Sequence, residues 1–184
     1  MKICRKLFVV IMANNDHGKT TIIKSFVSQG TGRIYQRFKK SQKTLTSPSG
    51  REISSYIFGR SYQEMERGPH GSTDAALSAN DPEWRTRELI VFPSHVAAGD
   101  LKDVEEMVRQ AHKNGFDAIG VPVLLEGNGY SNRSQFETFL ELNWDERWTL
   151  PNHAIDTGNI SSLNGQLDAL GRDLFWWVCA TLTK

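Results

Sequence analysis

The stretch LFVVIMANNDHGKTTIIKSFVSQ, residues 7–29, decides the fold expected of this chain. Its first six residues, Leu7 to Met12, form a continuous apolar run rich in β-branched side chains. Such a run is typical of a central parallel strand that is covered on both faces. A polar loop follows, and Thr20 to Gln29 then has the composition of a helix, which Gly30 is expected to end. The stretch therefore predicts a strand, a loop and a helix in direct succession.

Further strands and helices alternate along the rest of the chain. The expected strands lie at residues 43–58, as a hairpin turning at 47–50, and at 88–92, 116–125 and 148–150. The expected helices lie at 74–79, 100–113, 131–142 and 160–182. The polar segment 59–81 is otherwise expected to be a mobile loop. This alternation predicts a single α/β domain over residues 1–184, with a mostly parallel central sheet, helices on both faces and a β-hairpin after the first helix.

Three residues refine these boundaries. Thr73 and Asp100 are the expected N-caps of the helices that follow them, because their side-chain oxygens can accept a bond from a free backbone N–H. Pro122 conflicts with its position inside an expected buried strand, since proline lacks an N–H and suits edges and bulges.

Composition limits the classes of partner. The chain has 184 residues, with 22 Lys and Arg against 21 Asp and Glu, and this balance gives no signal for binding nucleic acid or a membrane surface. No segment approaches the roughly 20 apolar residues of a membrane span. Cys4 and Cys179 stand near opposite ends, which fits neither a disulfide framework nor a zinc site. We expect a cytoplasmic protein with no membrane partner.

Three adjacent aromatic residues, Phe175 to Trp177, fall in the last expected helix. Helical spacing allows only part of this cluster to face the core. We expect one tryptophan to pack inside, and the other to cover a neighbouring surface or the partner of a homodimer.

The polar loop carries the chemical signal. Residues 13–20, ANNDHGKT, resemble the Walker A pattern G-x-x-x-x-G-K-[ST] of P-loop NTPases, with Ala13 in place of the first glycine. The match follows a buried strand and opens a helix, which is the context that the pattern requires. The predicted phosphate-binding residues are Ala13, Asn14, Asn15, Asp16, His17, Gly18, Lys19, Thr20 and Thr21.

The resemblance implies a defined role for each part of the loop. Successive backbone N–H groups and the positive N-terminal end of the helix would bind phosphate oxygens, and Gly18 would let the backbone approach them. Lys19 would bridge the β- and γ-phosphates of ATP or GTP. The Thr20 hydroxyl would ligate Mg²⁺.

The segment Asp16 to Thr20 also looks like the phosphate loop of translation-factor GTPases. The other signatures of those GTPases are missing, because no Asp-x-x-Gly follows the hairpin and no Asn-Lys-x-Asp occurs. Asn152-His153 stands at a suitable late position without the required aspartate. The whole chain looks more like a small P-loop kinase or NTPase.

No aspartate ends the strand at 88–92, where a Walker B carboxylate is usual. Ser94 is the candidate replacement in the metal shell, and His95 is the candidate for positioning water or substrate. Glu126, after the next strand, and Asp16 are candidates for orienting Mg²⁺ or acting as a base.

Phosphoryl transfer also needs a cation besides Lys19 and Mg²⁺. Arg60 and Arg67 lie in the expected loop, and Arg133 follows the glycines at 127 and 129. We select Arg133 and Arg60 as the catalytic arginines.

Three functions follow from these residues. The first is a Mg²⁺-dependent enzyme that uses ATP, either as an NTPase or as a kinase for a small-molecule acceptor. The second is a GTPase-like switch that acts on a protein partner, with the hairpin and the loop 59–81 as moving parts. The third is a nucleotide-binding module without catalysis.

Overall fold

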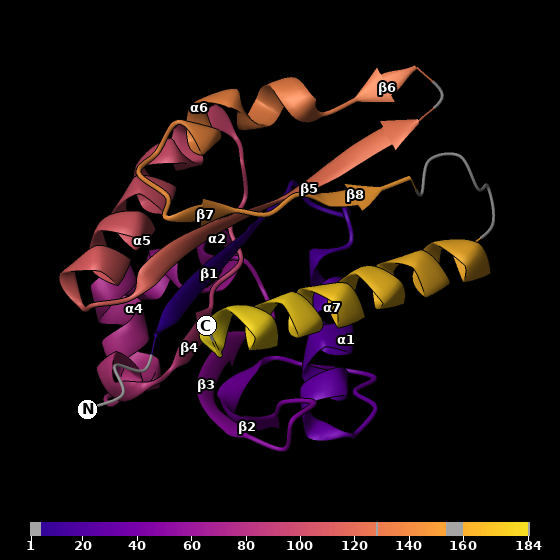
Figure 1. Cartoon of the computed structure of the whole chain (residues 1–184). Helices are drawn as coiled ribbons and strands as arrows, with labels where there is room; N and C mark the ends of the chain where they lie inside the picture. The colour runs from indigo at the N-terminus through magenta and orange to yellow at the C-terminus, as the bar shows by residue number, and fades with distance from the viewer. Residues whose placement is uncertain (1–4, 128, 154–159, 184) are drawn as a thin grey trace.

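A computed structural model describes residues 5–127, 129–153 and 160–183, and the side chains of residues 160–163 are outside the description. In these ranges the chain is an α/β protein built on one mixed, mostly parallel sheet of eight strands (Figure 1). The strands are β1 (Leu7–Met12), β2 (Lys40–Thr46), β3 (Glu52–Phe58), β4 (Leu89–Val91), β5 (Asp117–Gly127), β6 (Tyr130–Ser131), β7 (Glu146–Arg147) and β8 (Leu150–Asn152). The helices are α1 (Lys19–Thr31), α2 (Tyr62–Met65), α3 (Arg67–His70), α4 (Thr73–Asn80), α5 (Leu101–Lys113), α6 (Glu137–Leu140) and α7 (Ile160–Leu182). Short 3₁₀ turns are η1 (Trp84–Thr86), η2 (Ala98–Asp100) and η3 (Arg133–Phe136).

Strand β1 is central in the sheet. The order is β2-β3-β4-β1-β5-β6, and β7 and β8 also pair with β5. Val9 of β1 lies opposite Val91 of β4 on one side and Ile119 of β5 on the other, and both pairings are parallel. The hairpin of β2 and β3 and the pairing of β5 with β6 are antiparallel. The predicted strand Leu7–Met12 and the predicted hairpin are therefore confirmed.

The two faces of β1 contact different helical layers. Leu7, Val9 and Ile11 are buried in one core cluster with residues of α1 and α7. Phe8, Val10 and Met12 are buried in a second cluster with residues of α4 and α5. Helices therefore cover both faces, as the continuous apolar run predicts.

Strand β5 contains Pro122 without loss of the sheet. β5 pairs with β7 at Ile119 and Gly120, and then with β8 from Val123 onward. Pro122 falls in the interval between these two pairings. A change of partner strand thus accommodates a residue that lacks an N–H donor.

Helices α1 and α7 approach closely at two glycines. A Cβ on Gly171 of α7 would lie 2.4 Å from the Ile22 carbonyl oxygen, and a Cβ on Gly30 would lie 2.8 Å from the Phe175 ring. The prediction that Gly30 ends the first helix is therefore wrong, because it lies inside α1 as a packing position. Gly32, with a φ of 66°, is the left-handed C-cap.

The segment 59–81 is folded, which corrects the expectation of a loop. It forms α2, α3 and α4 around Glu66, whose side chain is 1% exposed. Glu66 accepts hydrogen bonds from Lys40 at 2.5 Å and from Asn80 at 2.8 Å. The N-cap of α4 is Ser72, whose hydroxyl accepts from the Ala75 N–H, and Thr73 is the first helical residue.

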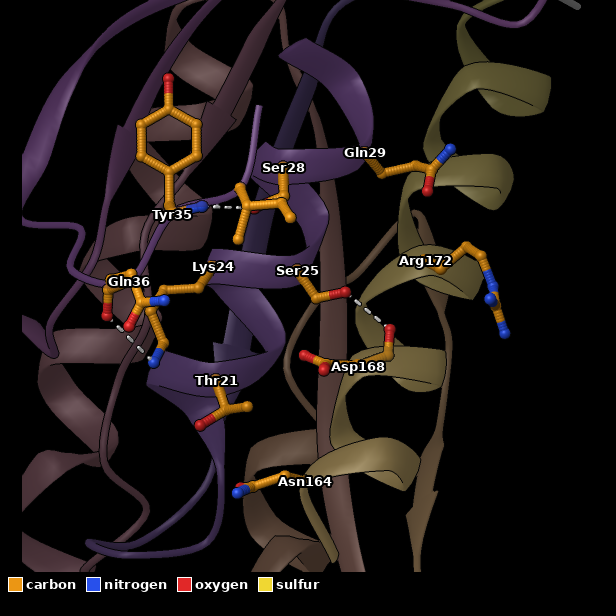
Figure 2. Close-up of a pocket in the computed structure, with 11 residues that line it drawn as sticks. Thr21, Lys24, Ser25, Ser28, Gln29, Tyr35, Gln36, Asn164, Asp168 and Arg172 are labelled. Atoms are coloured by element: carbon orange, nitrogen blue, oxygen red, sulfur yellow. Dashed lines mark hydrogen bonds between the residues drawn. The ribbon is translucent and has the colours of Figure 1, made fainter. Parts of the chain in front are cut away.

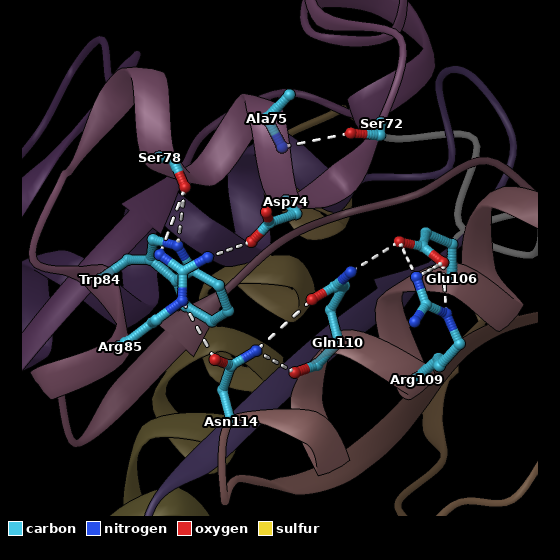
Figure 3. A network of polar contacts seen from close by, with 10 residues as sticks. All are labelled: Ser72, Asp74, Ala75, Ser78, Trp84, Arg85, Glu106, Arg109, Gln110 and Asn114. Carbon is cyan, nitrogen blue, oxygen red and sulfur yellow. Dashed lines mark hydrogen bonds and ion pairs between the residues drawn. The ribbon is translucent and has the colours of Figure 1, made fainter.

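A polar network ties α4 to α5 (Figure 3). The Arg85 guanidinium lies 4.7 Å from the centre of the Trp84 ring, forms an ion pair with Asp74, and donates to Asn114 at 3.1 Å. Asn114 also donates to the Gln110 carbonyl at the end of α5. The network fixes the layer that covers the Phe8 side of β1.

Other boundaries differ from expectation. Asp100 ends η2 and is the N-cap residue of α5, as predicted, but its carboxylate accepts from the Ala97 N–H and makes no capping bond to α5. The helix expected at 131–142 is divided into β6, η3 and α6, while the strand expected at 148–150 is replaced by β7 and β8. The C-terminal helix is confirmed.

The C-terminal aromatic cluster is split as expected. Phe175 is buried, Trp177 stacks on Trp148 with ring centres 4.8 Å apart, and the Trp176 residue is 50% exposed. Cys179 is buried, and Cys4 lies outside the described residues. No helix in the described ranges is long and apolar enough to cross a membrane.

Candidate functional site

Residues 13–21, here named the 13–21 loop, comprise the connection 13–18 after the carboxyl end of β1 and the first three residues of α1. Asp16 has a φ of 60° and Gly18 a φ of 91°, so the loop makes two left-handed steps before the helix begins. Asp16 is the only residue other than glycine with positive φ among the described residues. Helix α7 packs against the loop, because a Cβ on Gly18 would lie 2.5 Å from Leu167 Cδ2. Glycine is needed at position 18 for both conformation and space.

Lys19 is the first residue of α1, and its side chain turns back toward the loop. Its ammonium donates to the carbonyl oxygens of Ala13, at 2.5 Å, and Asn14, at 2.7 Å. Lys19 is buried, and burial lowers its pKa from 10.5 to about 8, although Glu64 and Asp16 oppose this shift. No ion pair to Lys19 occurs within the described part of the chain. The loop therefore holds the buried Lys19 ammonium, whose hydrogen-bond partners are neutral carbonyl groups.

Thr20 follows Lys19 and is exposed. Its hydroxyl donates to the Gly59 carbonyl oxygen at 3.4 Å. This contact brings the end of β3 beside the first turn of α1.

Two other segments contact the loop. The Asn152 amide, at the end of β8, donates to the His17 carbonyl at 3.5 Å. The Asn14 amide donates to Gln135 in η3 at 2.8 Å. Burial, and next the charge of Lys19, lower the pKa of His17.

The carboxyl end of β4 lies against β1 at the same edge of the sheet. Ser94 bridges to Met12, is fully buried, and has its hydroxyl engaged by Gln63 and by the His95 carbonyl. The His95 ring lies 2.8 Å from a Glu64 carboxylate oxygen. The Ser94 hydroxyl is thus hydrogen-bonded to other residues of the protein. The His95 ring contacts the Glu64 carboxylate, whose negative charge raises the pKa of Lys19.

The other predicted residues are dispersed around this edge. Glu126 and Arg133 form an ion pair at 3.1 Å near the end of β5, and the Arg133 side chain is 68% exposed. Arg60 follows Gly59 and lines a cavity together with Thr20. Arg60 follows β3 and Arg133 follows β5 and β6, so the two arginines come from opposite sides of β1 in the sheet.

Glu64 and Gln63 were missed by the sequence reasoning. They lie in α2, shortly after the carboxyl end of β3, and β3 is parallel to β4. Parallel strands bring their carboxyl ends to one edge, so this spacing contained the necessary signal. The expectation of a loop at residues 59–81 left α2, and with it Gln63 and Glu64, unpredicted.

Two hollows adjoin α1. A groove of about 580 Å³ runs between α1 and α7 and is lined by polar residues that include Ser25, Asp168 and Arg172 (Figure 2). The Ser25 hydroxyl donates to the Asp168 carbonyl across it at 2.6 Å. A larger cavity of about 800 Å³ lies at the other side of the first turn, where Thr20 is part of its wall.

No group of three or more His, Cys, Asp or Glu side chains suited to a metal ion occurs among the residues that the structure covers.

Protein-family models and curated proteins give no match to the chain. Among solved structures, two mutation variants of SsGBP are similar, with TM-scores of 0.36 and 0.35 and identities of 13% and 15%. The alignments cover 92% and 90% of this chain and 57% of each SsGBP chain, and likeness at this level carries no argument.

Proposed function

We propose that this protein binds a Mg²⁺–nucleoside triphosphate, ATP or GTP, on the 13–21 loop and transfers its γ-phosphoryl group to water or to a small acceptor. The observation that carries the proposal is the buried Lys19 ammonium, which contacts the neutral carbonyls of Ala13 and Asn14. A buried charge without an opposite charge is costly. A triphosphate beside it would supply the missing anion.

The surrounding backbone supports an anion at this place. Gly18 caps α1 in a left-handed conformation without a side-chain cap bond, so the positive N-terminal end of the helix lies at this loop, where it would favour a phosphate. Strand β1 connects through α1 to the hairpin on one side of it, whereas the neighbouring strand β4 connects through α5 to β5 on the other side. Ligands of open α/β sheets bind outside the carboxyl ends of the strands at such a switch point.

Thr20 is the residue that would hold Mg²⁺. Its exposed hydroxyl lies one position after Lys19 and faces the Gly59 carbonyl. Mg²⁺ in such sites keeps several waters and binds the substrate phosphates, and the Thr20 hydroxyl would be one protein ligand among them. When bound, the ion would neutralise negative charge on the phosphates.

The remaining residues would act on the nucleophile. The negative charge of Glu64 raises the pKa of Lys19. Glu64 would accept the proton of the attacking hydroxyl or water. His95 would orient that carboxylate through their 2.8 Å contact. Arg60 would add positive charge from the side of Thr20.

A GTPase-like switch is the second candidate. It is favoured by Asn152, because this asparagine donates to the His17 carbonyl of the loop. However, the segment that would move is folded around the buried Glu66. Tight binding of GTP with ATP excluded would favour the switch over the enzyme.

Nucleotide turnover tests the proposal. Wild-type protein should hydrolyse ATP or GTP, or transfer its phosphate, in the presence of Mg²⁺, and Lys19→Ala should not. Lys102→Ala, which removes an exposed lysine of α5, is the matched control and should retain turnover. Turnover that survives in Lys19→Ala would remove the assignment.

A further inference from the structure

The cavity of about 800 Å³ beside Thr20 is lined by four segments, which are the first turns of α1 and residues 36–40, 58–60 and 65–66. A Cβ on Gly59 would lie 2.2 Å from the Lys39 carbonyl oxygen and 2.5 Å from that of Phe38. Glycine thus lets the end of β3 touch the chain that enters β2. Phe38, Lys39 and Gly59 all line the cavity.

The cavity is strongly basic. Five cationic residues line it: Lys24, Arg37, Lys39, Lys40 and Arg60. The one carboxylate in its wall, Glu66, is already bonded to Lys40 and Asn80. The chain as a whole has a net charge of +1, so this concentration of positive charge is local.

An apolar surface accompanies the charge. Phe38 and Phe58 are 9% and 1% exposed, and Met65 is 47% exposed at the opening. The Phe58 ring stacks on Phe92 at 3.9 Å, which fixes this wall. Such a lining recognises an anion that is attached to an apolar or planar group.

We propose that this cavity binds the phosphoryl acceptor, and that the acceptor is a small organic phosphate with its own hydroxyl group. This inference rests on the proposed function. In the transfer, the acceptor oxygen bonds to the γ-phosphorus and the bond from that phosphorus to the β,γ-bridging oxygen breaks. The nucleoside diphosphate leaves with the electron pair, and the hydroxyl proton passes to Glu64 and then to solvent.

The test is calorimetry on the full chain loaded with Mg²⁺–ADP, which fills the phosphate loop before the probe is added. Phenyl phosphate is the probe, phenol is the neutral ring and inorganic phosphate is the bare anion. The variant Arg37→Gln/Lys39→Gln removes two charges from the cavity. The variant Lys102→Gln/Lys113→Gln removes two exposed charges from α5 and is the control.

Phenyl phosphate should bind the loaded wild type, more tightly than phenol or inorganic phosphate. The cavity variant should weaken this binding about tenfold and leave ADP affinity unchanged. The control should bind like wild type. Normal ADP binding without phenyl phosphate binding would overturn the cavity proposal alone, as would equal weakening in both variants or equal affinity for inorganic phosphate. Absence of ADP binding would instead overturn the proposed function.

Discussion

Lys19 is the residue on which the account depends, and its ionisation gives the first prediction. The folded pKa of about 8 lies below the ordinary 10.5, because burial disfavours the charged form. The free folded protein therefore binds this proton more weakly than the unfolded chain does. The contribution of Lys19 to stability should rise as the pH increases from about 8 to 10.5.

Nucleotide binding should have the opposite dependence on pH. A neutral amine offers no charge to phosphate, so the affinity for Mg²⁺–ATP should fall above pH 8 in the wild type. Lys19→Arg keeps its charge throughout this range and should give a flat profile at whatever affinity it retains. Titrations between pH 7 and 9.5 measure both, and a flat wild-type profile would contradict the role of the ammonium.

Glu64 gives the second prediction at this scale. If its carboxylate takes the proton of the nucleophile, Glu64→Gln should lower turnover by about 100-fold while changing nucleotide affinity little. Glu105→Gln, on the exposed side of α5, supplies the control. A Glu64→Gln protein with normal turnover would exclude Glu64 as the base.

At the scale of elements, the packing of α7 on α1 and on the loop is the main structural constraint. Gly171 lies where a Cβ would meet the Ile22 carbonyl at 2.4 Å, a contact that no side-chain rotation relieves. Gly165, in the same helix, has nothing within 4 Å of its Cβ position.

This difference predicts opposite effects of one substitution. Gly171→Ala should destabilise the protein by about 1–3 kcal/mol, because the two helices must separate. Gly165→Ala should stabilise it by up to about 1 kcal/mol through helix propensity. Denaturant unfolding measures both, and a neutral or stabilising Gly171→Ala would show that the helices are not in close contact.

The sequence predicted those elements whose signals are local. The apolar run of β1, the turn of the hairpin and the 3–4 spacing of Leu167, Leu170 and Leu174 each determine their own structure. The sequence prediction failed where a contact between residues far apart in the chain determines the local structure. Gly30 lies inside a helix, where it packs on the Phe175 ring. Residues 59–81 fold around Glu66, which accepts hydrogen bonds from Lys40 and Asn80.

At the scale of the whole molecule, the sheet order determines which predicted residues meet. β4 lies beside β1, so the Ser94 carbonyl accepts from the Ala13 N–H of the loop. Helix α2, which follows β3 in the chain, adds Gln63 beside Ser94 and Glu64 beside His95. Arg60 and Arg133 follow strands on different sides of β1. Strand order depends on long-range pairing, which local patterns in one sequence do not contain.

Calorimetric titration with Mg²⁺–ATP and Mg²⁺–GTP tests the central claim most directly. Wild-type protein should bind at least one of them at a single site, and Lys19→Ala should weaken that binding about 100-fold. Lys102→Ala should leave the affinity unchanged. Wild-type protein that binds neither nucleotide, or a Lys19→Ala protein that binds as tightly as wild type, would contradict the assignment of the 13–21 loop.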